Sequence, residues 1–219
     1  MSKEVDYGVV VADDEKWWAE RTAGAWKEAL TKEGVNSGIK VVSGYQELLK
    51  SIKMTPALIV LDHKYEENYR LWRPEEVELE NLAREMGVDF NPIKKPDRGG
   101  WIVSDMPDGL YHPNSVNFGL LLRYFGFTGK IVVVSSDPPE PDYITRELTD
   151  LNTHLGSFDL EVSDPIDAVV CKPSRYHPNQ FQYATQRRAS TQGEIWWDYQ
   201  QIEGEDFSVA IGQLLRTLL

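Results

Sequence analysis

Polar residues of three kinds stand where apolar runs of the sequence end, and their types suit one kind of chemistry. Asp13 and Asp14 follow the first run, Asp62 the third, Ser135 the fourth and Lys172 the fifth. Carboxylates can hold a hard divalent cation through their oxygen atoms. A hydroxyl can bind a phosphoryl oxygen, and an ammonium group can balance phosphate charge. If the fold brings them together, these residues indicate a metal-dependent phosphoryl site.

The segments that must position these residues alternate between short apolar runs and longer stretches with helical periodicity. The runs contain few polar residues, which is typical of strands covered on both faces. This alternation predicts a doubly wound parallel sheet with right-handed crossovers and a ligand site beyond the carboxyl ends of its strands. We expect strands at 7–12, 39–42, 57–61, 130–134 and 168–171, and helices at 15–33, about 45–53, 73–84, 114–125, 142–153 and 205–219.

Each polar residue also has an ordinary structural interpretation. A carboxylate pair after a strand is most often the N-cap of the next helix with its neighbour. A lone Asp or Ser at a strand end is usually a cap or turn residue, and a lone Lys is usually solvated. The functional interpretation therefore depends on the joint arrangement of these residues.

Four segments carry a resemblance to a known family. They are VVVADDE (9–15), ALIVLD (57–62), KIVVVSS (130–136) and AVVCKP (168–173). In this order and at these strand ends, they resemble the receiver domain of two-component response regulators. The resemblance implies an α/β, flavodoxin-like fold whose five parallel strands have the order 2-1-3-4-5. We expect residues 1–219 to form a single receiver-like domain with insertions at about 63–113 and 174–203.

The resemblance assigns metal binding to the acidic residues. Asp13 and Asp14 would coordinate Mg²⁺, one directly and one mainly through water. Asp62 would be a further ligand, together with the backbone carbonyl of Lys64. Because acids packed together repel one another, a bound cation is also a physical requirement of such a cluster.

The resemblance also assigns the phosphoryl chemistry. Asp62 would be the nucleophile that accepts a phosphoryl group from a sensor histidine kinase or a phosphotransfer protein. Ser135 would donate a hydrogen bond to the phosphoryl group. Lys172 would pair with Asp62 before the reaction and with the phosphoryl oxygens afterwards.

The sequence departs from the receiver pattern after the acceptor. The segment between Asp62 and Ser135 is about 40 to 45 residues longer than in an ordinary receiver. The Met-Pro pair that usually follows the acceptor is absent, and His63 comes directly after Asp62. His63 could tune access to the acceptor or its hydrolysis, or it could be an ordinary solvated loop residue. In the fifth strand, Val169 stands where receivers commonly have Tyr or Phe.

A Met-Pro pair does occur later, in the segment Ser104–Gly109 (SDMPDG). One interpretation is that the first insertion splits the loop after Asp62. The rival interpretation makes Asp105 the acceptor at the end of a strand that begins at Trp101. We favour Asp62, because the rival leaves the strand at 57–61 unassigned.

Composition narrows the classes of function. The 219 residues carry a net charge of −12, from 23 Lys and Arg against 35 Asp and Glu, so nucleic acid and anionic membranes would repel the chain. A single cysteine, Cys171, excludes an intramolecular disulfide and a Cys-rich metal site.

The chain contains no apolar run long enough to span a membrane and no signal-peptide core, so we expect a cytoplasmic protein. The dinucleotide, Walker A, nucleophile-elbow and HExxH motifs are all absent from the sequence.

The leading hypothesis is a stand-alone response regulator or receiver-like signalling protein that is phosphorylated on Asp62 with Mg²⁺ bound. Its output would be contact with a downstream protein partner. A first alternative is a pseudo-receiver that binds partners without being phosphorylated. A second is a Mg²⁺-dependent phosphohydrolase that uses the same acids.

Overall fold

A computed structural model describes the chain over residues 8–63, 65, 69–72, 76–88, 115–135, 166–171, 180–188, 195–203 and 207–218. The predicted helix at 142–153, the alternative acceptor Asp105, and Lys64 and Lys172 lie outside these residues. That the whole chain forms one domain stays a prediction. Among the described residues, no helix combines the length and apolar character needed to cross a membrane.

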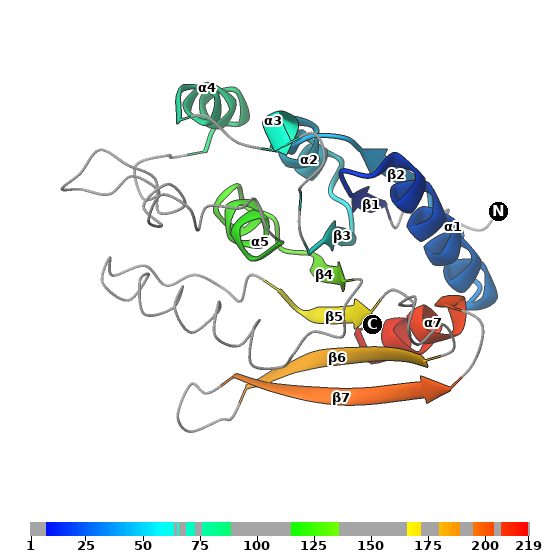
Figure 1. Ribbon diagram of the computed structural model, residues 1–219. Coiled ribbons are helices and arrows are strands. Elements are labelled where there is room, and N and C mark those ends of the chain that lie inside the picture. The colour runs from blue at the N-terminus through cyan, green and yellow to red at the C-terminus, as the bar shows by residue number, and fades with distance from the viewer. Residues whose placement is uncertain are drawn as a thin grey trace.

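The strands form one sheet with the order β2-β1-β3-β4-β5-β6-β7 (Figure 1). The first five are parallel and have the predicted flavodoxin-like order 2-1-3-4-5. Two further strands, β6 and β7, extend the sheet beyond β5 in antiparallel fashion and fall within the second predicted insertion. The strands are β1 (Val9–Ala12), β2 (Ile39–Val42), β3 (Leu58–Asp62), β4 (Lys130–Ser135), β5 (Ala168–Cys171), β6 (Gln180–Arg188) and β7 (Ile195–Glu203).

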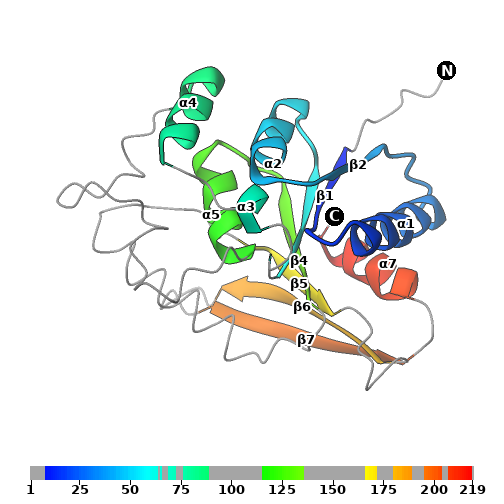
Figure 2. The same cartoon turned by 45° about the horizontal axis from the view of Figure 1, so that its top comes forward.

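Helices lie on both faces of the parallel part of the sheet (Figure 2). One face packs against α1 and α7, and the other packs against α2, α4 and α5. Because successive side chains of a strand point to opposite faces, Val10 and Ile59 join one core, whereas Val9 and Val60 join the other. The helices are α1 (Lys16–Lys32), α2 (Tyr45–Ser51), the 3-10 helix η1 (Ile52–Met54), α3 (Tyr69–Trp72), α4 (Glu76–Met86), α5 (Ser115–Tyr124) and α7 (Phe207–Leu218).

The predicted elements that fall in the described residues are present, with small shifts at their ends. The strand at 39–42 and the strand at 168–171 have the predicted bounds. The helix that was expected to begin at 73 is observed from Glu76. Helix α1 ends as its sequence indicates, because Gly34 adopts a left-handed φ of 75° and Val35 N–H donates to Leu30 O at 2.9 Å. This turn directs the chain back toward β2.

Candidate functional site

The acidic residues converge at the carboxyl ends of two central strands. Asp13 and Asp14 follow β1, and Asp62 is the last residue of β3. These strands pair in parallel with Ala12 opposite Leu61, so that Asp13 and Asp62 occupy the next position along the two strands. Each of the three residues places a carboxylate oxygen within 4.8 Å of the other two. The prediction that these acids lie together is confirmed.

Asp13 is the most enclosed of the cluster and also shapes the backbone beside it. Its residue is 5% exposed, whereas Asp14 and Asp62 are partly buried. Asp13 Oδ1 accepts a hydrogen bond from Glu15 N–H at 3.0 Å, just before α1 begins. Asp13 is not the N-cap of α1, because that position is Glu15 and no side chain caps the helix. Its carboxylate has further lone pairs on its two oxygens that could bind a cation.

Ser135 lies at the same edge of the sheet, on the strand that follows β3 in space. Asp62 is in register with Val134, so Ser135 is one position further along β4. The residue is 5% exposed and is in register with Cys171, the last residue of β5. Lys172 comes next in the chain and is among the residues that the structure does not describe, as is Lys64. The roles of Ser135, Lys172 and Lys64 stay predictions.

Tyr65 contributes to the site and was not identified from the sequence. Its side chain is 1% exposed, and its hydroxyl donates to Ala12 O, directly before Asp13, at 3.3 Å. Burial raises the pKa of Tyr65 well above its usual value, and the negative charges of Asp62, Asp13 and Asp14 raise it further. Tyr65 is thus a neutral hydroxyl beneath the acidic cluster.

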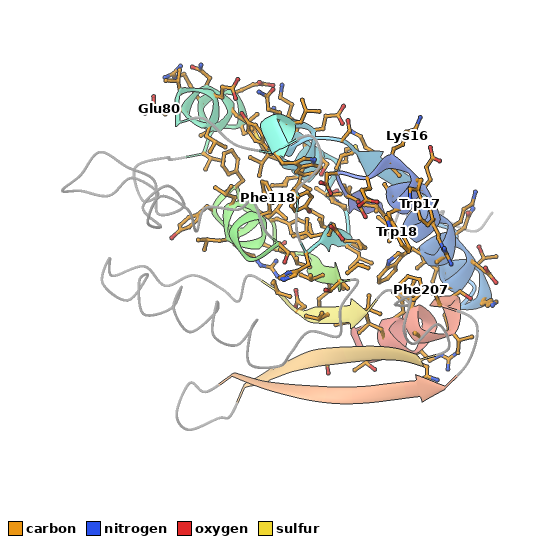
Figure 3. The ribbon with its side chains drawn as sticks, viewed as in Figure 1. Lys16, Trp17, Trp18, Glu80, Phe118 and Phe207 are labelled. Atoms are coloured by element: carbon orange, nitrogen blue, oxygen red, sulfur yellow. The ribbon has the colours of Figure 1, made fainter. Side chains whose placement is uncertain are left out.

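An aromatic cluster holds Tyr65 in place. Its ring centroid lies 4.1 Å from that of Trp72 on α3 and 5.0 Å from that of Phe118 on α5. The Trp72 and Phe118 rings are themselves edge-to-face at 5.5 Å, and Figure 3 labels Phe118 on α5. The sequence shows these three aromatic residues after Asp62, but they are far apart along the chain. Their contact depends on the tertiary fold, so the sequence alone could not identify Tyr65 as part of the site.

His63 connects the end of β3 to its neighbours instead of standing free in solvent. Its backbone N–H donates to Val134 O at 3.0 Å, and its carbonyl accepts from Ser115 N–H at 3.1 Å. Its ring Nδ1 lies 3.3 Å from Ser115 Oγ at the start of α5. The interpretation of His63 as an ordinary solvated loop residue is therefore wrong, because the residue is partly buried and bonded to two elements.

An aromatic pair at the start of α1 lies close in sequence to the acids. Trp17 and Trp18 stack with ring centroids 4.2 Å apart, and the Arg21 guanidinium carbon lies 5.6 and 5.3 Å from them. Figure 3 labels both residues on α1. Trp17 is 54% exposed, and Trp18 is partly buried.

The acidic cluster fits a hard divalent cation. Its donors are carboxylate oxygens alone, which suit Mg²⁺ or Ca²⁺ better than a soft metal. Because like charges at this separation raise one another's free energy, a cation among them would relieve the repulsion. The described residues can therefore hold a metal ion at the carboxyl edge of the sheet.

Comparisons with solved structures give weak likenesses. No protein-family model and no curated protein matches the chain. The chain is similar to the isolated REC domain of RcsB from Salmonella enterica serovar Typhimurium, solved in the presence of phosphomimetic BeF3−, with 13% identity over 76% of this chain and 78% of that chain and a TM-score of 0.35. It is also similar to methionyl-tRNA formyltransferase from Clostridium thermocellum, with 15% identity over 90% of this chain and 99% of that chain and a TM-score of 0.19. Since both TM-scores are low, the fold assignment rests on strand order and register.

Proposed function

We propose that this protein is a receiver-like signalling protein that is phosphorylated on Asp62 in a Mg²⁺-dependent manner. The observation that carries the proposal is the approach of the Asp13, Asp14 and Asp62 carboxylates to within 4.8 Å at the carboxyl edge of a sheet with the order 2-1-3-4-5. In a doubly wound sheet this edge is where ligands bind. The sequence segments that resemble receivers supply the same residues.

Metal binding is the first step of the proposed mechanism. Asp13, Asp14 and Asp62 would hold Mg²⁺, with the carbonyl of Lys64 as a further ligand. The cation would neutralise charge that develops as a carboxylate approaches a phosphoryl group. Asp13 is well suited to a fixed role here, because its hydrogen bond from Glu15 N–H orients the carboxylate.

Phosphoryl transfer is the second step. One Asp62 oxygen attacks the phosphorus of a phosphohistidine on a sensor histidine kinase or phosphotransfer protein. The phosphorus–nitrogen bond breaks, its electron pair stays on the imidazole, and Asp62 becomes an acyl phosphate. Ser135 and Lys172 would then bind the phosphoryl oxygens, Ser135 by donating a hydrogen bond and Lys172 by its charge.

The output is proposed to be a contact with a downstream protein partner in the cytoplasm. Val169 lies buried in β5, in register with Val133 of β4 and Ala184 of β6. An aliphatic side chain cannot supply the aromatic movement that the family commonly uses at this position. We therefore expect phosphorylation to act on the partner surface through other residues near Ser135.

Intact-mass spectrometry tests the proposal directly. The full chain is incubated with a small phosphodonor, with and without Mg²⁺, alongside Asp62→Asn and Asp105→Asn. We expect a mass increase of one phosphoryl group that requires Mg²⁺ and is lost only in Asp62→Asn. An adduct lost in Asp105→Asn instead would transfer the acceptor role to that residue.

Two further results would redirect the proposal. Failure to form an adduct in any variant, with no Mg²⁺ binding by titration, would favour the pseudo-receiver. Continuous release of phosphate from a generic phosphate ester would favour the phosphohydrolase. Glu28→Gln, an exposed substitution on α1, is the matched control for the loss of one negative charge.

A further inference from the structure

Strand β7 (Ile195–Glu203) forms one edge of the sheet. It pairs with β6 in an unbroken antiparallel register from Gln180↔Glu203 to Arg188↔Ile195. Within the described part of the chain, no strand pairs with β7 on the side away from β6. Figures 1 and 2 both show β7 outside β6, at the margin of the ribbon. A long regular edge offers a row of backbone donors and acceptors to another strand.

The sequence of β7 has few of the features that normally protect an edge strand. IWWDYQQIE contains no Pro and no Lys, and its register with β6 has no bulge. The opposite edge of the sheet differs, because β2 (Ile39–Val42) has only four residues and includes Lys40. The two edges thus differ in their capacity to pair with a further strand.

We propose that two copies of this chain associate by antiparallel pairing of β7 with the partner's β7, which makes one continuous sheet through both copies. Pairing that uses all of Ile195–Glu203 places the two-fold axis at Tyr199. In that register, Asp198 lies opposite the partner's Gln200, and Trp196 lies opposite the partner's Ile202. The strand is therefore self-complementary, since neither acid of β7 faces an acid of the other copy.

The charge of the whole chain sets the conditions for this association. Each copy carries a net charge of −12, so the copies repel one another at long range. Salt screens this repulsion but leaves backbone hydrogen bonds in place, so the dimer should become tighter as salt increases. The edge lies four strands from β3, or about 19 Å at ordinary strand spacing, so the proposal does not depend on phosphorylation of Asp62.

Charge substitutions at Gln200 test the register as well as the association. Gln200→Glu would place an acid opposite the partner's Asp198 on both sides of the axis, and Gln200→Lys would place a base there. Sedimentation velocity across a range of protein concentrations should show a dissociation constant weakened between about 2-fold and 30-fold by Gln200→Glu. Gln200→Lys should strengthen the dimer over a similar range.

Gln201→Glu and Gln201→Lys are the matched controls. They make the same changes in net charge on the same strand, but Gln201 lies opposite the partner's Trp197, so neither should change the dissociation constant much. Hydrogen exchange should also show protection of residues 195–203 that increases with protein concentration. A chain that stays monomeric at high salt, or a dimer that responds alike to charge at Gln200 and Gln201, would overturn the proposal.

Discussion

At the amino edge of the parallel sheet, Asp167 lies between two cations, whereas at the carboxyl edge Asp13, Asp14 and Asp62 lie against one another. Asp167 Oδ2 is 2.8 Å from an Arg123 Nη and accepts from Ile131 N–H at 2.9 Å, and its Oδ1 is 3.0 Å from Lys130 Nζ. Arg123 also donates to the carbonyls of the turn before β4. Here negative charge is matched within the fold.

The carboxyl edge gathers three carboxylates instead. Its three carboxylates approach to within 4.8 Å of one another, and their negative charges raise the pKa of the nearby Tyr65. Such an arrangement costs stability unless a cation or a positively charged group compensates it. The comparison teaches that the same residue type is structural at one edge and, by our proposal, functional at the other.

The largest expected effect is at the amino edge. Arg123→Met should lower the free energy of unfolding by about 3 kcal/mol, because it removes the guanidinium from Asp167 and from two turn carbonyls. The Arg123 side chain is only 8% exposed, so water cannot fully replace these bonds. Urea denaturation measures the change. Arg84→Met, on the exposed side of α4, is the control and should change stability by under about 0.5 kcal/mol.

Metal addition should separate the two edges. At a Mg²⁺ concentration tenfold above its dissociation constant, the wild-type chain should gain about 1.4 kcal/mol of stability. Asp62→Asn should lose most of this gain, whereas Asp167→Asn should keep it despite being less stable overall. Thermal unfolding with and without Mg²⁺ gives both values. Equal gains in the two variants would place the metal away from the acidic cluster.

Charge removal without metal should have opposite signs at the two edges. In Mg²⁺-free buffer, Asp14→Asn should raise the free energy of unfolding by about 1 kcal/mol, because it relieves repulsion from Asp13 and Asp62. The same substitution at Asp167 should lower it, because Arg123 and Lys130 lose their partner. Urea denaturation at low and high salt measures both changes. A loss of stability in Asp14→Asn would contradict the account of the cluster.

The sequence was sufficient to predict the parallel part of the sheet and the gathering of its acids. Strands buried on both faces appear in the sequence as uninterrupted apolar runs, and the residue after each run lies at the carboxyl edge of the sheet. Asp13 and Asp62 could therefore be placed side by side from the topology alone. The distance between their carboxylates could not be predicted, because it depends on the register of β1 and β3 and on side-chain rotamers.

The regions that could not be predicted are those whose partners are distant in the sequence. Strand β6 alternates Phe181 and Tyr183 with glutamines, which was a usable period-two signal, but its many polar residues suggested an irregular insertion. Its pairing with β5 and β7 defines it as a strand. Tyr65 was missed for a related reason, since its burial depends on Trp72 and Phe118.

Tyr65 offers the finest test of the charge at the carboxyl edge, with the smallest expected change at neutral pH. Tyr65→Phe should lower the free energy of unfolding by only about 0.5 kcal/mol at pH 7, because the lost hydrogen bond to Ala12 O is long, at 3.3 Å. The informative range is alkaline. Burial and the nearby acids raise the pKa of Tyr65 in the folded state, whereas the unfolded chain releases this proton near pH 10.

The sign of the alkaline effect follows from this difference. The folded state binds more protons than the unfolded state above about pH 10, so the stability from Tyr65 is present below that pH and is lost as the pH rises toward the folded pKa. Urea denaturation from neutral to alkaline pH should show a shallower loss in Tyr65→Phe than in the wild type. Asp62→Asn should lower the pKa of Tyr65 and thus also reduce the loss.

Tyr124 provides the matched control from the other end of the sheet. It lies on α5 beside Arg123, and burial alone raises its pKa to about 12. Tyr124→Phe should therefore remove its own alkaline contribution, and that contribution should be the same with Asp62 or Asn at position 62. If Asp62→Asn changed the contributions of Tyr65 and Tyr124 equally, the charge at the carboxyl edge would not be the cause of the Tyr65 shift.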